Sequence, residues 1–290
     1  MPAQPHARTP PFRDRRDRCP GVLRPWPASD GLLVRLRLIG GHVSSAALRA
    51  LLGVAEEYGD GRVHVTVRAN LQVRALPGQD GALDPAALAA IETTGLLPTR
   101  THELVRNVLA SPQTGLAGGR ADLRPVAADL DDFLCRRAPL AALPGRFLFV
   151  LDDGRGDLLD RDCDLGLTVL DAADAQLRVG WDWGPVVPLG DAAARIADLA
   201  DAFLRSRGSG PSAPWHVAEL PEPLIPPVPP DPRQPAVAGA LPYGPVPGGR
   251  HVAVPEAGLD RAAVDELTAG VPEVIVTPWR GVLVPEERSR

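Results

Sequence analysis

The sequence contains no lysine, few asparagines and few aromatic residues. All 31 basic residues are arginines, Asn70 and Asn107 are the two asparagines, and Phe, Trp and Tyr together make up 4% of the chain. This usage is typical of a GC-rich genome, so the abundance of arginine does not by itself indicate a function. The formal net charge of −5 argues against a nucleic-acid-binding protein, because such domains are usually basic.

Cysteines are scarce, and long apolar runs are absent from the sequence. Cys19, Cys135 and Cys163 are far apart and form no CxxC pair, so they encode neither a zinc ribbon nor a self-contained four-cysteine iron–sulfur site. No apolar run approaches the roughly 18 residues of a membrane span, and residues 1–18 lack the apolar core of a signal peptide. We therefore expect a cytoplasmic protein with a disordered tail over residues 1–18, no membrane or nucleic-acid partner and no metal site.

The hydrophobic pattern predicts strands that alternate with helices. Capping residues and glycine stops support the predicted helices at several ends. The predicted strands cover residues 32–38, 63–67, 146–151, 165–170, 177–183, 250–254 and 273–277, and the predicted helices cover residues 46–57, 84–95, 124–137, 192–205 and 259–269.

Two further segments are read from their composition. Residues 208–238 are so rich in proline that they can form neither a helix nor a central strand, which predicts an extended linker. A spacer role and a PxxP ligand for an SH3-like partner both remain open. The alternating Asp160, Asp162 and Asp164 are expected to form a solvated acidic turn, because Leu165 stands where a calcium loop needs glycine.

A weak internal repeat connects the two ends of the chain. When the sequence is shifted by 211 positions, Val276-Thr277 falls on Val65-Thr66, and Val282 and Val284 fall on Leu71 and Val73. This spacing predicts two related units that flank a middle domain with pseudo-twofold symmetry.

Two short stretches are candidates for ligand binding, because each places an asparagine near an arginine. They are residues 66–74, with Arg68, Asn70 and Gln72, and residues 104–112, with Arg106 and Asn107. An arginine fork beside an amide suits a planar anion. The alternative is that Asn70 serves a turn and Asn107 a helix end.

A cationic sheet face supports the ligand-binding interpretation. We expect five basic side chains to project from one side of two neighbouring strands, where their mutual repulsion favours an anionic partner. A solvated rim with acidic neighbours is the alternative. The five residues are Arg35, Arg37, Arg62, His64 and Arg68.

Five segments, in this order, resemble the sirohaem-dependent sulfite and nitrite reductase superfamily, and within it the precorrin-3B synthases of cobalamin biosynthesis. They are CPGVLRPWPASDGLLVRLRLIGGHV, VHVTVRANLQVR, LVRNVLASPQTG, LPGRFLFVLDDG and VTPWRGVLVP. The resemblance covers roughly residues 15–287. Its most specific parts are the Arg68/Gln72 stretch, Arg106-Asn107 and the TPWRG segment.

This resemblance implies an α+β fold in which two ferredoxin-like half-domains, related by a pseudo-twofold axis, flank a sirohaem-reductase-type α/β domain. The half-domains are expected at residues 19–78 and 239–290, the α/β domain at 79–207 and the linker at 208–238. The resemblance also implies an oxidoreductase that oxygenates and lactonises precorrin-3A, a tetrapyrrole rich in carboxylates.

Roles for individual residues follow from the same resemblance. Arg68, Arg106 and Arg146 are expected at the reacting centre, and Arg35, Arg37, Asn70, Gln72 and Asn107 are expected to hold the tetrapyrrole or a sirohaem-like ligand. The reductases carry a second basic residue two positions after Arg146, whereas this chain has Leu148. That departure favours a corrinoid reaction over sulfite or nitrite reduction.

The family's [4Fe–4S] cluster is expected to lack a ligand set in this chain, because its four cysteines follow the TPWRG strand in the relatives. Cys19 is expected to be structural, and Cys135 and Cys163 small buried residues. We therefore expect either an enzyme completed by a cluster-bearing domain, partner chain or dimer, or a non-catalytic tetrapyrrole-binding subunit or truncated remnant. A nitrite- or sulfite-reductase-like protein is a further alternative.

Overall fold

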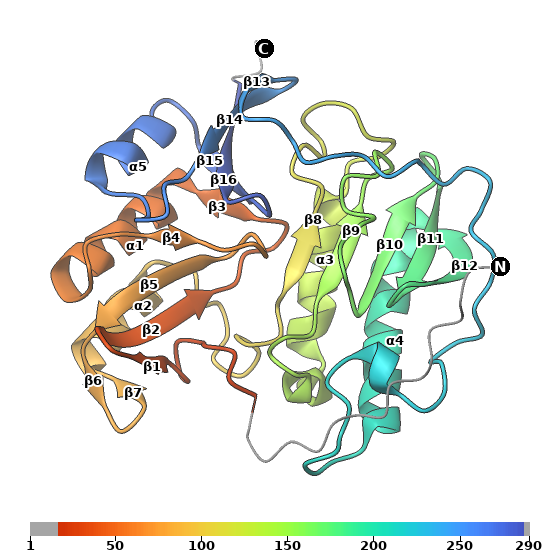
Figure 1. Ribbon diagram of the computed structural model, residues 1–290, viewed down its shortest axis with the longest axis horizontal. Coiled ribbons are helices and arrows are strands. Elements are labelled where there is room, and N and C mark those ends of the chain that lie inside the picture. The colour runs from red at the N-terminus through yellow and green to blue at the C-terminus, as the bar shows by residue number, and fades with distance from the viewer. Residues whose placement is uncertain (1–16, 287–290) are drawn as a thin grey trace.

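The computed structural model describes residues 17–286, so most of the tail predicted for residues 1–18 lies outside the described part of the chain. Two units lie side by side in Figure 1. One is built from the two ends of the described chain, and the other is built from its middle. Among the described residues, no helix is both long and apolar enough to cross a lipid bilayer.

The first half-domain is an antiparallel sheet covered by helices. Its strand order is β1-β2-β5-β4, and a small hairpin, β6-β7, follows it. Its main helix begins at Ser44, whose side chain accepts a hydrogen bond from the Ala47 amide, as the sequence predicts. The elements are β1 (Trp26–Ala28), β2 (Gly31–Leu36), α1 (Ser45–Tyr58), β4 (His64–Val65), β5 (Leu71–Leu76), β6 (Gly78–Gln79), β7 (Ala82–Leu83) and α2 (Pro85–Thr93).

The second half-domain repeats this arrangement near the C-terminus. Its strand order is β13-β14-β16-β15, and β3 of the first half-domain pairs with the outer edge of β15. The elements are β3 (His42–Ser44), β13 (Gly244–Val246), β14 (Gly249–Ala253), α5 (Arg261–Leu267), β15 (Glu273–Thr277) and β16 (Gly281–Pro285).

Strand register supports the predicted pseudo-twofold relation. The pairs Val65↔Leu71 and Val276↔Val282 are equivalent at the predicted offset of 211 residues. The turns between these strands also match, because Ala69 and Arg280 occupy equivalent positions and both have a left-handed backbone (φ 54° and 58°).

The two halves also exchange equivalent contacts. Val43, just before α1, pairs with Val274 of the second half-domain. Leu259, just before α5, forms a bridge with Val63 of the first half-domain. These reciprocal pairings are what a twofold relation between the halves requires.

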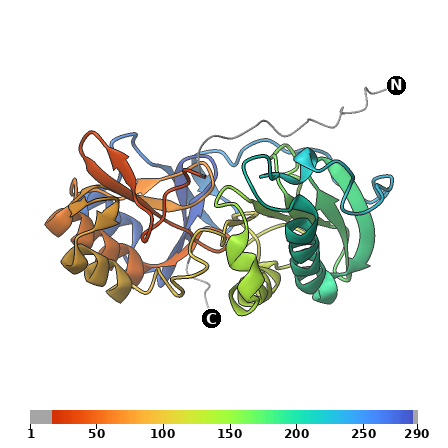
Figure 2. The same ribbon diagram turned by 90° about the horizontal axis from the view of Figure 1, so that it is seen from below.

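The middle unit is a mixed five-stranded sheet in the order β12-β11-β10-β9-β8. Strands β8, β9 and β10 are parallel, while β11 and β12 run antiparallel to their neighbours. Helices α3 and α4 pack side by side against this sheet (Figure 2). The elements are β8 (Val108–Ala110), α3 (Arg124–Arg136), η1 (Ala138–Ala142), β9 (Phe149–Asp152), β10 (Leu165–Val169), β11 (Asp174–Val179), β12 (Asp182–Pro188), η2 (Leu189–Asp191) and α4 (Ala192–Arg207).

Two predictions for the middle unit and its surroundings need correction. The strand predicted over residues 177–183 is wrong, because Gly180 turns the chain there with φ 61° between β11 and β12. Residues 208–238 form no helix apart from the short η3 (Val217–Glu219) and no strand beyond a bridge at Val228, but they are not a free spacer. The amides of Val228 and Asp231 donate hydrogen bonds to the Trp183 carbonyl and the Gln176 side chain at 2.9 and 2.8 Å. The segment therefore crosses the middle unit as a packed strap before it reaches the second half-domain (Figure 1).

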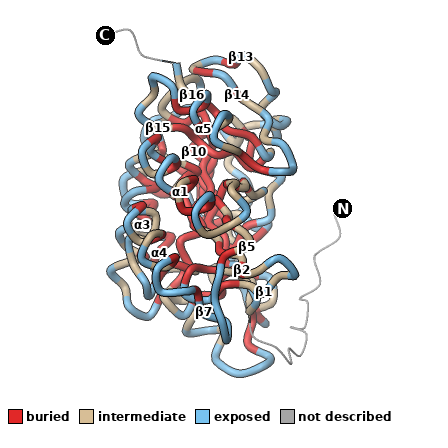
Figure 3. The backbone as a smooth tube through the Cα atoms, turned by 90° about the vertical axis from the view of Figure 1, so that its left-hand side faces the viewer, coloured by how far each residue is buried: buried red, intermediate tan, exposed pale blue. Residues whose placement is uncertain are grey.

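Buried segments run through the interior of the molecule (Figure 3), and their apolar residues form two large clusters. One is shared by the two half-domains and joins Leu48, Val73, Val264 and Val276. The other lies between the middle sheet and its helices. Since the first cluster uses residues from both half-domains, the two ends of the described chain are stabilised together.

Candidate functional site

Three of the predicted arginines meet at one pocket of about 530 Å³. Arg35 comes from β2, Arg68 from the turn between β4 and β5, and Arg146 from the loop before β9. The half-domain and the middle unit therefore both contribute to this site, which we call the arginine pocket. Its other lining residues are Asp17, Arg18, Cys19, Pro20 and Trp215.

The arginine pocket carries a net positive charge, because four arginines and one aspartate line it. Among the ion pairs of residues 17–286, none involves Arg35, Arg68 or Arg146. The Nε atom of Arg35 is buried with no hydrogen-bond partner, and its Nη2 atom donates to Gln72 Oε1 at 3.4 Å. Burial and the neighbouring charge of Arg68 lower the pKa of Arg35. An anion in this pocket would meet guanidinium groups that no carboxylate of residues 17–286 pairs with.

A second group of predicted residues lies behind the pocket and supports it. Arg37 is 4% exposed, and its guanidinium donates to Asn107 Oδ1 at 2.9 Å and to the carbonyls of Pro20 and Gly145. Burial, followed by the charge of Arg35, lowers the pKa of Arg37 to about 10. Because protein groups take up its donors, the expectation that Arg37 contacts the ligand is not supported.

The two asparagines of the chain contact each other. Asn70 Nδ2 donates to Asn107 Oδ1 at 3.4 Å, and Asn107 Nδ2 donates to the Gly145 carbonyl at 2.9 Å. Asn70 Oδ1 accepts the Leu38 amide at 2.9 Å. Both side chains are buried, so they act as a polar joint between the first half-domain and the middle unit rather than as direct ligands. Gln72 holds Arg35 from the neighbouring strand.

Arg106 does not belong to the pocket. Its guanidinium forms two hydrogen bonds to Asp131 on α3, with Nε and Nη2 at 2.6 and 2.7 Å from the carboxylate oxygens. The side chain is 8% exposed. Arg106 therefore joins the start of β8 to α3 in this structure, and its predicted catalytic role stays a prediction.

The expected cationic sheet face is smaller than the sequence suggested. Strands β2 and β4 are not neighbours, because β5 lies between them. His64 contacts Asp60 at 2.8 Å, and Arg62 lies 3.6 Å from Asp260. These two residues have the acidic neighbours of the alternative interpretation, which leaves Arg35 and Arg68 facing the pocket.

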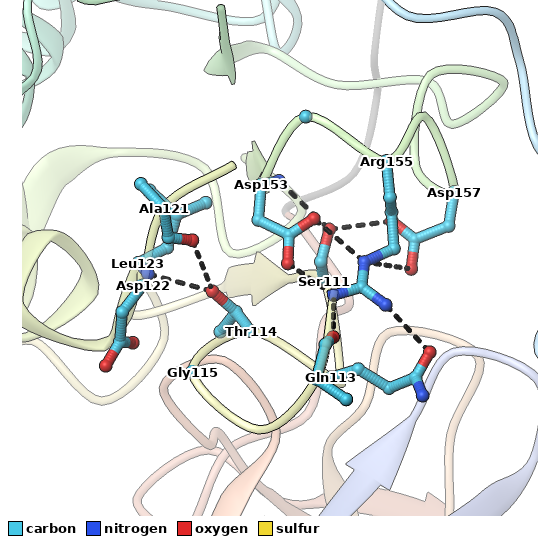
Figure 4. A network of polar contacts seen from close by, with 12 residues as sticks. Ser111, Gln113, Thr114, Gly115, Ala121, Asp122, Leu123, Asp153, Arg155 and Asp157 are labelled. Carbon is cyan, nitrogen blue, oxygen red and sulfur yellow. Dashed lines mark hydrogen bonds and ion pairs between the residues drawn. The ribbon is translucent and has the colours of Figure 1, made fainter. Parts of the chain in front are cut away.

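A buried carboxylate cluster lies at the end of β9 (Figure 4), and the sequence interpretation did not identify it. Asp152, Asp153 and Asp157 offer oxygens within 4.8 Å of one another. Burial, followed by the charge of Asp152, raises the pKa of Asp157 to about 7. Arg155 already donates to both oxygens of Asp153, at 2.8 and 2.7 Å.

Asp152 in this cluster is also occupied. It accepts the amides of Gly154, Gly156 and Leu158 and so shapes the loop after β9. The cluster is thus a structural network with its own cation, Arg155. The Asp-Asp-Gly-Arg-Gly-Asp order directly after an apolar strand was the available sequence signal.

Asp164 differs from the expected solvated turn. It is 1% exposed and accepts the amides of Leu148 and Val217 at 2.8 and 3.1 Å. Burial raises its pKa to about 6, while the nearby His216 opposes that shift. Asp164 therefore ties the strap to the loop that carries Arg146.

The described cysteines do not fit an iron–sulfur cluster. Cys19 lines the arginine pocket, Cys135 lies in α3 and Cys163 is buried beside the Gly180 carbonyl. Within residues 17–286, the one group of three metal-ligating side chains is the aspartate cluster. The arginine pocket, by contrast, suits carboxylate groups, such as those of a tetrapyrrole, because the guanidinium groups of Arg35, Arg68 and Arg146 converge there.

Known proteins resemble this chain in both sequence and fold. Residues 27–81 match the nitrite/sulfite reductase ferredoxin-like half domain. A precorrin-3B synthase from Sinorhizobium sp is 33% identical over 147 residues, which is 48% of this chain and 29% of the relative. A ferredoxin–nitrite reductase from Leptolyngbya laminosa is 33% identical over 126 residues, which is 42% of this chain and 24% of the relative.

A solved structure shows the same fold over most of the chain. The NirA protein of Mycobacterium tuberculosis superposes with a TM-score of 0.63 at 19% identity, covering 88% of this chain and 54% of that protein. The matched regions thus span less than a third of the curated relatives and about half of NirA.

These matches agree with the paired half-domains of the structure. Residues 27–81 match a nitrite/sulfite reductase ferredoxin-like half domain, and the chain as a whole has an α+β fold like that of NirA. Over 147 residues its sequence is similar to that of a precorrin-3B synthase.

Proposed function

We propose that this chain is the tetrapyrrole-binding part of a precorrin-3B synthase-like oxidoreductase of cobalamin biosynthesis in the cytoplasm. The observation that carries the proposal is the arginine pocket, where Arg35, Arg68 and Arg146 converge without an ion-pair partner among the described residues. Carboxylates on a tetrapyrrole would accept hydrogen bonds from these guanidinium groups. The similarity to a precorrin-3B synthase supports this choice of ligand.

The residues behind the pocket would keep its arginines in position. Arg68 Nη1 donates to the Arg146 carbonyl at 2.7 Å, and Arg37 and Asn107 both donate to the adjacent Gly145 carbonyl. These contacts hold the two sides of the pocket at a fixed separation, which lowers the ordering cost of binding. Oxygen insertion and lactone formation would need an iron centre to activate oxygen, which we assign to a further domain or a cluster-bearing partner.

A reductase acting on nitrite or sulfite is the second candidate, favoured by the similarity to a ferredoxin–nitrite reductase. Leu148 weighs against it. That side chain is 6% exposed and belongs to the apolar cluster of the half-domains, so it offers no charge beside Arg146. A binding subunit without catalysis would use the same pocket.

The proposal is tested by titrating the purified chain with uroporphyrin, a tetrapyrrole that carries carboxylates on every ring. The variants Arg35→Gln, Arg68→Gln and Arg146→Gln each remove one positive charge. Each lost charged hydrogen bond is worth about 1.5–3 kcal/mol, so we expect each variant to bind roughly ten- to a hundredfold more weakly.

Arg136→Gln is the matched control. This arginine is 76% exposed and pairs with Asp132 on the outside of α3, so its loss should leave uroporphyrin binding unchanged. Equal affinity in the wild type and all three pocket variants would show that the arginine pocket is not the tetrapyrrole site.

A further inference from the structure

A second pocket of about 420 Å³ adjoins the arginine pocket. The two share Arg146, and the adjacent residues Trp215 and His216 line one pocket each. Trp181 and Trp183 also line the second pocket, which we call the tryptophan pocket. Three of the five tryptophans of the chain therefore surround these two pockets, in a sequence with 4% aromatic residues. Such a concentration of indoles beside arginines suits a ligand with both a flat ring and charged groups.

Trp181 lies on the β11–β12 hairpin, beside the buried guanidinium of Arg178. It follows Gly180 in the turn between β11 and β12, and it remains 59% exposed. The Arg178 guanidinium lies 6.0 Å from the Trp181 ring and 5.7 Å from the Trp183 ring. Arg178 is 3% exposed and donates to the carbonyls of Leu158 and Arg161. A fixed cation therefore supports both indoles, which is the geometry of a preformed stacking surface.

The two pockets differ in charge, and this difference would orient a ligand that carries carboxylates. Asp162, Asp182 and Glu219 line the tryptophan pocket and would repel carboxylates, whereas the arginine pocket attracts them. His216 lies beside two carboxylates in the wall of this pocket. Its Nδ1 accepts the Ala218 amide at 3.0 Å, and its Nε2, which has no hydrogen-bond partner, lies 3.5 Å from Asp162 and 3.7 Å from Asp164. The histidine is thus held as part of the wall.

We propose that one ligand occupies both pockets, with its carboxylates in the arginine pocket and its flat ring against Trp181. This inference rests on the proposed function and adds the part of the site that recognises the ring. It makes Trp181 a specificity-determining residue, because a compact polycarboxylate would fill the arginine pocket without reaching the indole.

Two probes separate the two halves of the site. Uroporphyrin carries both the ring and the carboxylates, whereas citrate carries only carboxylates. We expect Trp181→Ala to weaken uroporphyrin binding about three- to tenfold, because an aromatic contact is lost. Citrate should compete for the arginine pocket of Trp181→Ala with the same affinity as in the wild type. Trp181→Phe keeps a flat ring and should restore most of the uroporphyrin affinity.

The outcomes distinguish this inference from the function on which it rests. If Trp181→Ala binds uroporphyrin like the wild type while Arg68→Gln binds it weakly, the inference is wrong and the proposed function stands. If Trp181→Ala weakens uroporphyrin and citrate equally, the indole acts through the arginine pocket and the inference is also wrong. If Arg68→Gln and Trp181→Ala both bind like the wild type, both proposals fail.

Discussion

Arginines near the site differ in what accepts their hydrogen bonds, and this difference decides their roles. Arg106 faces a carboxylate on α3, and Arg37 faces an amide and backbone carbonyls, so both are committed to the fold. Arg35 lines the arginine pocket without an ion-pair partner among the described residues and can still take an anion. The sequence alone could not distinguish these arginines, because their hydrogen-bond partners are distant in the chain. Asp131 lies 25 residues from Arg106, and Gly145 lies 108 residues from Arg37.

Replacing Arg106 by leucine should lower stability without changing ligand affinity. The substitution leaves Asp131 without its partner and removes two charged hydrogen bonds from a partly buried pair. We expect the free energy of unfolding to fall by about 1–3 kcal/mol in a urea titration. Arg136→Leu, which breaks an exposed pair, should change it by no more than about 0.5 kcal/mol. Weaker uroporphyrin binding by a folded Arg106→Leu variant would show instead that Arg106 contributes to ligand binding.

The aspartate cluster should make stability depend on pH. The folded state raises the pKa of Asp157 to about 7, so it binds this proton more tightly than the unfolded chain does. Stability from this group is therefore greatest at acidic pH. It falls as the pH rises from about 4 to 7, by at most about 1.4 kcal/mol per pH unit. Asp157→Asn should flatten that slope in urea titrations between pH 4 and 8, and an unchanged slope would contradict this assignment.

At the level of elements, the sequence predicted the helices better than the short strands. Helices α1, α2, α3 and α4 follow the predicted segments closely, because caps and apolar spacing are local signals. Short strands were harder to predict. β4 has two residues, and β1 and β13 have three, so their positions depend on pairing with distant strands rather than on local periodicity. The exchange of β3 to the other half-domain is also a tertiary effect that no local pattern reveals.

Gly41 of the first half-domain packs closely against Val276 of the second, so stability should be sensitive to a single methyl group at this contact. A Cβ on Gly41 would lie 2.2 Å from the Val276 carbonyl oxygen, and the backbone there has φ 80°. We expect Gly41→Ala to lower the free energy of unfolding by about 1–3 kcal/mol. Gly53→Ala is the matched control, because its Cβ meets nothing within 4 Å inside α1. It should raise stability by about 0.5–1 kcal/mol in the same urea titration. Equal effects of the two substitutions would contradict the close crossing.

At the scale of the whole molecule, the candidate site exists only where the first half-domain meets the middle unit. The sequence singled out Arg35, Arg68 and Arg146, and the fold brings them to one pocket from three separate segments. It did not reveal the tryptophan pocket, because Trp181 reaches the site through the β11–β12 turn that the sequence pattern missed. The strap over residues 208–238 closes this side of the site, and its packing could not be read from proline content alone.

The most direct test of the account is a crystal structure of the chain with bound uroporphyrin. The account predicts ligand carboxylates within hydrogen-bonding distance of Arg35 and Arg68, with the macrocycle lying against Trp181. A complex in which the tetrapyrrole binds elsewhere, with neither arginine in contact with it, would contradict the central claim that this pocket is the tetrapyrrole site.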